Sequence, residues 1–360
     1  NDNWQVIVSW REKAGDFTAD ELVIKSSELL KEANSYKMQG NLAFEFEVEG
    51  NEIIKEILGM SGLGMDMAME GVFQNEPMAM YLKQTVKMPL EDLGLSPEEL
   101  EAAGLGEDMV TEMVWHENKI YQKNPMMDQW IYQDLAGMEE IFDINNLMQI
   151  TPQQSIDMMN KAGVINVFGE DVERDGKEYY TIKNYIDAES FKSLMEEVLG
   201  KMDFASFMAA FAGQFGEEED IAPQFEQVFD IMLNTMTIDY YVDTLIDKET
   251  LLSDYMSVDL NMKIDVKQVL EAMAEMMEIE EDEEAPIPEG LIIKIKMKGD
   301  YQLSDYGVEL ELPDLSNAIS QEEYIQQLME KMEQIEESKD LMEQETAEDM
   351  DTTESETIEE

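Results

Sequence analysis

Apolar and polar residues alternate along several stretches of the chain with the period of two that β-strands produce. The clearest stretch is 256–264, where every even position is apolar and every odd position is polar or charged. A strand with one apolar and one charged face belongs to an antiparallel sheet that is covered on one side and wet on the other, so a parallel, doubly covered sheet is disfavoured. The same alternation predicts strands over 42–48, 65–69, 291–297 and 308–312.

Two dipeptides are expected to form hairpin turns between strands, because their residue types tolerate the positive φ of tight turns. They are Asp175-Gly176 and Glu117-Asn118. Helical segments interrupt the strands. Thr18-Ala-Asp-Glu21 has the form of a capping box and predicts a helix that ends near Asn34. Further helices are predicted over 151–161, 188–215 and 267–277, the second with an apolar stripe of Phe204, Phe207, Met208, Phe211 and Phe215.

Composition excludes several classes of function. The chain has 360 residues, with 24 Lys and Arg against 83 Asp and Glu, which gives a formal charge of −59. Such a chain is repelled by nucleic-acid phosphates and by anionic membrane surfaces, so we expect no nucleic-acid partner. The longest apolar runs are too short for a membrane-spanning helix.

Candidate catalytic groups are scarce. The chain has no Cys and one His, so thiolate nucleophiles, disulfides and Cys-based metal sites are excluded. A Ser-His-Asp triad would need His116, which lies at a predicted hairpin end where an exposed His is the preferred interpretation. Carboxylates are too numerous for spacing alone to identify an acid–base pair, so a carboxylate hydrolase is the least favoured hypothesis. We therefore expect a protein that is not an enzyme and uses no cofactor or metal.

The 31 methionines are unusual in number and in position. Met65, Met67 and Met69 point to one face of their strand, and Met78 and Met80 alternate in the same way. Core filling is the simplest interpretation, and a thioether site for Cu(I) is less favoured because no His or Cys accompanies them. A third interpretation is a flexible wall around an apolar ligand. The predicted cavity lining is Phe44, Phe46, Met65, Met67, Met69, Met78, Met80, Met256, Val258, Leu260, Met262, Phe207 and Phe211.

The order of elements resembles that of bacterial lipoproteins with a LolA/LppX-like fold. The resemblance lies in the helix end 27–36 followed by the strand 37–48, in the strand–turn–strand segment 239–252, and in 307–313 as a closing strand. It implies an α+β fold, in which a strongly bent antiparallel sheet forms a half-barrel and helices cover its concave face. It also implies an apolar cavity, which in some relatives carries a lipid or acyl chain, and a lipidated Cys anchor. Because this sequence contains no Cys, such an anchor would lie upstream of Asn1.

These observations predict three regions: a linker over 1–17 from an upstream anchor, a LolA/LppX-like domain over 18–319, and an acidic tail over 320–360 that is first helical and then disordered. The leading hypothesis is a non-enzymatic lipoprotein on the outer face of the cell membrane that binds or carries an apolar, lipid-like ligand in a Met-rich cavity. The alternative is an envelope sensor or protein-interaction module that uses its acidic surface and tail and binds no ligand.

Overall fold

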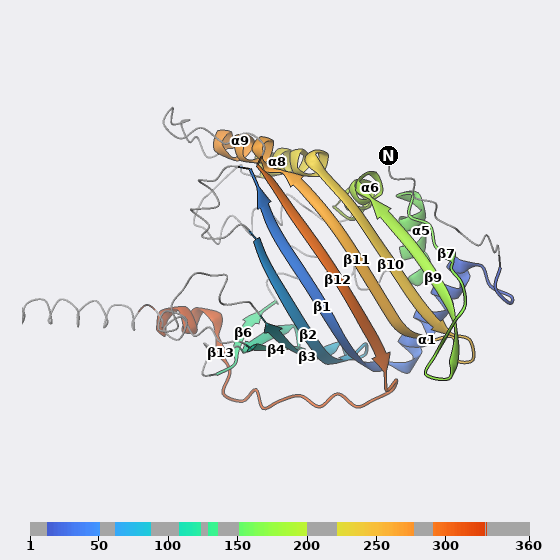
Figure 1. Cartoon of the computed structure of the whole chain (residues 1–360). Coiled ribbons are helices and arrows are strands. Elements are labelled where there is room, and N and C mark those ends of the chain that lie inside the picture. The colour runs from blue at the N-terminus through green and yellow to red at the C-terminus, as the bar shows by residue number, and fades with distance from the viewer. Residues whose placement is uncertain are drawn as a thin grey trace, which may run out of the picture.

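A single open, curved sheet dominates the computed structural model, and helices pack against one of its faces (Figure 1). The structure describes residues 13–50, 62–87, 108–123, 129–135, 151–199, 222–276, 291–327 and 329. Within these residues the strand order is β13-β6-β5-β4-β3-β2-β1-β12-β11-β10-β9-β7, and β8 also pairs with β9. The predicted α+β half-barrel is therefore confirmed.

The element bounds follow the chain order. The helices are α1 (Ala19–Ala33), α5 (Pro152–Lys161), α6 (Ala188–Leu199), α8 (Ala222–Thr235) and α9 (Val266–Met276). The strands are β1 (Ser35–Glu49), β2 (Gly62–Gln74), β3 (Ala79–Lys87), β4 (Asp108–His116), β5 (Lys119–Lys123), β6 (Ile131–Asp134), β7 (Val167–Phe168), β8 (Val172–Arg174), β9 (Lys177–Asp187), β10 (Met236–Asp247), β11 (Ser253–Asp265), β12 (Ile292–Ser304) and β13 (Ile319–Ser320).

The register of the central strands keeps the alternating pattern in phase from strand to strand. Phe44 of β1 pairs with Met65 of β2 and with Met297 of β12, and Met297 pairs in turn with Leu260 of β11. A slip of one residue would move every apolar side chain to the opposite side, so this register gives the sheet an apolar face and a polar face. We call these two surfaces the apolar face, which carries Phe44, and the polar face, which carries Glu45.

Helix α1 closes one end of the apolar face. It begins at the predicted capping box, in which Glu21 N donates to Thr18 Oγ1 at 3.2 Å and Thr18 N donates to Glu21 Oε2 at 2.8 Å. It ends at Asn34, whose φ of 67° lies in the left-handed region. Leu22 is completely buried and forms a core cluster with side chains that include Ile182 of β9 and Ile246 of β10. Burying one leucine in this way contributes about 2 kcal/mol.

The other helices follow the predictions where they are described. Helix α5 has a capping box from Thr151 and Gln154 and packs against α1. Helix α6 follows β9 directly, and Asp187 Oδ1 accepts a hydrogen bond from Ser190 N in its first turn. Helices α8 and α9 lie together near the other end of β10 to β12 (Figure 1). The rest of the helix predicted over 188–215, with its phenylalanine stripe, lies outside the described residues.

Both predicted hairpin turns are confirmed. Glu117 and Asn118 have φ of 50° and 58° between β4 and β5, and Asp175 and Gly176 have φ of 53° and 79° between β8 and β9. His116 lies at the end of β4, opposite Lys119, as the pattern predicted.

The prediction of a closing strand over 308–312 is wrong. The chain leaves the sheet after Ser304, and residues 308–315 belong to no strand, although Ser35 still binds the backbone of Gly307 and Val308. The physical reason is that β12 already lies between β1 and β11, so the returning chain finds no free edge beside it. It continues instead to β13, which pairs with β6 in the one parallel ladder among the described strands. The tail is described only to residue 329, so its predicted disordered part, beyond about residue 343, lies outside the described residues.

Candidate functional site

The apolar face gathers most of the side chains that were predicted to line a cavity. Successive cross-strand rows place Phe44 beside Met65, Leu42 beside Met67, and Phe46 beside Met262 through Ile295. The row of Met69 continues through Gly40 and Tyr301 to Met256. The residues of β1, β2, β3 and β11 that were predicted to line a cavity therefore share one continuous surface.

Most of these side chains are only half-buried. Phe44, Phe46, Met65, Met67, Met69, Met80, Met256, Leu260 and Met262 all fall in this intermediate class, and Val258 is buried at 6% exposure. Met78 lies one residue before β3, in the turn after Pro77, and its side chain is 44% exposed. Phe207 and Phe211 lie outside the described residues. The lining of a cavity by this set stays a prediction.

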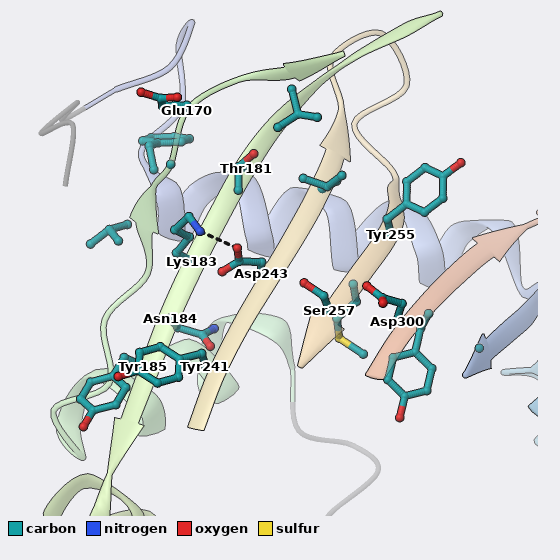
Figure 2. Close-up of a pocket in the computed structure, with 18 of the residues that line it drawn as sticks. Glu170, Thr181, Lys183, Asn184, Tyr185, Tyr241, Asp243, Tyr255, Ser257 and Asp300 are labelled. Carbon is teal, nitrogen blue, oxygen red and sulfur yellow. Dashed lines mark hydrogen bonds and ion pairs between the residues drawn. The ribbon is translucent and has the colours of Figure 1, made fainter. Parts of the chain in front are cut away.

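A groove of about 1350 Å³ lies on the polar face. It is bounded by the segment that carries β7 and β8 and extends over β9, β10, β11 and β12 to β1. In Figure 2 the side chains of Lys183, Tyr241 and Asp243 stand in front of the strands, while helix α1 lies behind them. The groove and the apolar face are thus on opposite sides of the same strands.

Aromatic and charged side chains form the floor of this groove. Tyr185 and Tyr241 stack with ring centroids 4.7 Å apart, and Tyr185 donates to Asp239 Oδ1 at 2.6 Å. Burial and this hydrogen bond to a carboxylate raise the pKa of Tyr185, so the phenol stays protonated at neutral pH. Next to the ring pair, Lys183 Nζ lies 2.5 Å from Asp243 Oδ2 (Figure 2).

At the hairpin end of the groove, Arg174 stacks its guanidinium 3.7 Å from the ring centroid of Tyr255. The hydroxyl of Tyr255 donates to Asp175 Oδ2 at 2.9 Å. Among the described residues that line the groove, the basic side chains of Arg174 and Lys183 are therefore already engaged with neighbours on the same surface.

A separate cluster of ionised groups lies beside this hairpin and serves the fold. Lys177 Nζ lies 3.0 Å from Asp247 and 2.9 Å from Asp254, and both carboxylates are buried. Tyr179 and Tyr306 also donate to Asp254. Hydrogen bonds to Asp254 and Asp247 raise the pKa of Lys177, so the ammonium stays charged. Every member has a partner, as buried charges require.

Metal ligands do not cluster in the described part of the chain: no group of three or more His, Asp or Glu side chains there could hold a metal ion. His116 lies 3.5 Å from its neighbour Glu117, at the exposed hairpin end. None of the described helices is long and apolar enough to cross a membrane.

The groove was not among the sites predicted from the sequence. Its signal was present as aromatic residues on the charged side of the alternation, namely Tyr185 between Asn184 and Ile186, and Tyr241 in β10. The two tyrosines come together only because β9 pairs with β10, and this pairing joins segments more than 50 residues apart.

Fold and surfaces together define this protein as an open α+β half-barrel with one apolar and one polar face. A family of unknown function (DUF6612) matches residues 18–284, and the chain belongs to this family. Among solved structures it is similar to the lipoprotein LppX of Mycobacterium tuberculosis, with 11% identity and a TM-score of 0.32 over 82% of this chain and 98% of that one. It is also similar to LprF from Mycobacterium bovis, with 12% identity and a TM-score of 0.33 over 82% and 96% of the two chains. No curated protein matches the sequence.

Proposed function

We propose that this protein is a non-enzymatic, cell-surface protein that binds or carries an apolar, lipid-like ligand on the apolar face of its half-barrel. The observation that carries the proposal is the continuous row of half-buried Met, Phe and Leu side chains across β2, β1, β12 and β11. Monomeric proteins rarely leave such a surface without a partner or ligand, because each half-buried side chain forgoes part of its transfer free energy.

The chemistry of this face favours a ligand of variable shape. Methionine is unbranched and polarizable, so it adapts to irregular apolar surfaces at low cost. No charged side chain interrupts the rows from Met65 to Leu260 or from Leu63 to Met262. The ligand class that matches is a fatty acyl chain or a similar hydrocarbon, and the proposed location on the outer face of the cell membrane would give the protein access to it.

The proposal is tested with 11-(dansylamino)undecanoic acid, whose fluorescence rises in apolar sites. Met67 lies on the apolar face and Ala68, its exposed neighbour in β2, lies on the polar face. We expect Met67→Glu to weaken probe binding by at least about tenfold, because a carboxylate would be desolvated by the ligand. The matched control Ala68→Glu adds the same charge to the same strand and should change the affinity by less than about twofold.

Met67→Ala provides a second variant that keeps the face apolar, and circular dichroism checks the folding of all three variants. Wild-type protein that does not bind the probe, or equal losses for Met67→Glu and Ala68→Glu, would refute the proposal. Lipid extraction of protein purified from its own host, followed by mass spectrometry, identifies the natural ligand.

A further inference from the structure

The groove on the polar face is built from residues that stand side by side across five strands. One cross-strand row runs Asn41, Asp300, Ser257, Asp243 and Lys183, from β1 to β9. A neighbouring row runs Gln39, Gln302, Tyr255, Leu245 and Thr181. Four strand spacings of about 4.8 Å make these rows about 19 Å long, which is the length of about six residues of extended peptide.

The described lining of the groove has an excess of negative charge. Its acidic residues are Glu170, Asp187, Asp239, Asp243 and Asp300, and its basic residues are Lys183 and Arg174. Asp187 and Asp239 are also direct cross-strand partners, an arrangement of like charges that costs free energy. A positively charged group placed between them would remove this repulsion.

The same groove collects exposed apolar surface. Among the described residues, the large apolar side chains that remain exposed are Met78, Ile165, Val172, Tyr185, Ile325 and Met329. Three of them, Ile165 at 57%, Val172 at 37% and Tyr185 at 41%, line this groove. Tyr185 and Tyr241 also present aromatic rings next to Asp239, which is the arrangement that attracts an ammonium or guanidinium group.

One polar group in the groove wall lacks a hydrogen-bond partner. Thr181 is only 4% exposed, and its Oγ1 makes no hydrogen bond in the described structure although it lines the groove (Figure 2). A buried hydroxyl without a partner costs free energy that a ligand N–H could recover.

From these observations we propose that the polar-face groove binds an extended, basic peptide segment of a partner protein, with Lys or Arg side chains alternating with apolar ones. The cationic side chains lie over the Tyr185 and Tyr241 rings and against Asp187, Asp239 and Asp300. The apolar side chains contact Ile165 and Val172, and about six residues fill the length of the groove. This proposal does not depend on the apolar-ligand proposal, because the two sites lie on opposite faces.

The test is calorimetric titration of the full chain with an acetylated, amidated hexapeptide in which three lysines alternate with three isoleucines. We expect binding that weakens steeply between 50 and 300 mM NaCl, and no binding of the same peptide with glutamate in place of lysine. Tyr241→Ala should weaken binding about fivefold to thirtyfold through loss of the cation–π contact. Asp239→Asn, which keeps the hydrogen-bond acceptor for Tyr185, should weaken it by a similar factor.

Asp66→Asn is the matched control, since it removes one carboxylate from the polar face of β2, outside the groove. It should alter affinity by less than about twofold. Equal losses for Asp66→Asn and Asp239→Asn would overturn the proposal, because they would show general attraction to an acidic protein. Spermidine binding as tightly as the peptide, or a neutral hexasaccharide binding where the peptide does not, would overturn it as well.

Discussion

At the scale of single residues, the Asp247 carboxylate shows how this acidic chain holds buried charge. Burial alone would raise its pKa, but hydrogen bonds from Thr250 N, Lys177 and Glu249 N outweigh that effect, and the pKa is lowered. A carboxylate with a lowered folded-state pKa contributes stability above its unfolded pKa, near 4, and loses it as the pH falls through the folded value. Asp247 should therefore contribute to unfolding in acid.

We predict that Asp247→Asn destabilises the protein at pH 7 by about 1 to 3 kcal/mol, because Lys177 loses a buried partner. The variant should also have a smaller decline in stability below pH 4 than the wild type. Urea unfolding at pH 7, 5 and 3 measures both effects. Glu249→Gln, an exposed change in the same turn, is the control, and a control that behaves like Asp247→Asn would contradict this explanation.

At the scale of elements, close packing of side chains over backbone limits what the central strands accept. A Cβ added to Gly40 of β1 would lie 2.5 Å from Tyr301 Cδ1 and 2.9 Å from the Asp300 carbonyl oxygen, whereas a Cβ on Gly64 of β2 would meet nothing within 4 Å. The Tyr301 ring thus occupies the space that Gly40 leaves. Leu42 similarly occupies the space over Gly299, where an added Cβ would lie 2.8 Å from Leu42 Cδ1.

Gly40→Ala should therefore destabilise the protein by about 1 to 3 kcal/mol, the usual cost of overpacking. Gly64→Ala should be neutral or slightly stabilising, because alanine restricts the unfolded chain without a clash. Thermal unfolding of the two variants side by side measures the difference. Equal melting temperatures would show that the Tyr301 ring moves aside freely.

The elements were largely predictable, and the groove was not. Alternation identified the central strands because one face is apolar throughout, and Thr18 with Glu21 marked the start of α1. The segment 308–312 has the same alternation but forms no strand, since strand formation also needs a free edge, which only the complete sheet order reveals. The groove depends on rows such as Lys183, Asp243, Ser257 and Asp300, whose members are distant in sequence, so their proximity could not be predicted from local pattern.

At the scale of the whole molecule, the formal charge of −59 is only partly balanced. Lysines of β12 pair with carboxylates of the adjacent strands, as in Lys296 with Glu45 at 3.0 Å and Lys298 with Asp259 at 3.2 Å. Such exposed pairs contribute at most about 1 kcal/mol each, so the net self-repulsion persists.

The melting temperature should consequently rise by several degrees between 10 mM and 300 mM NaCl, because the screening length shortens from about 30 Å to less than 10 Å. Most of the rise should come below 300 mM, which distinguishes screening from the gradual salting-out effect at molar salt. Differential scanning calorimetry across this series measures the effect. A melting temperature that is constant up to 1 M NaCl would show that repulsion among the carboxylates does not destabilise the fold.

The two surfaces of the sheet are separated by a single layer of backbone. In β11, Ser257 belongs to the groove and its neighbour Val258 points to the apolar face. A ligand on the apolar face that shifts β11 relative to β10 must also change the distance between Ser257 and Asp243 on the polar face. Occupancy of either surface would then alter the affinity of the other by the same factor, as thermodynamic linkage requires. A half-barrel whose two faces share one layer of strands can in this way report on one face what is bound to the other.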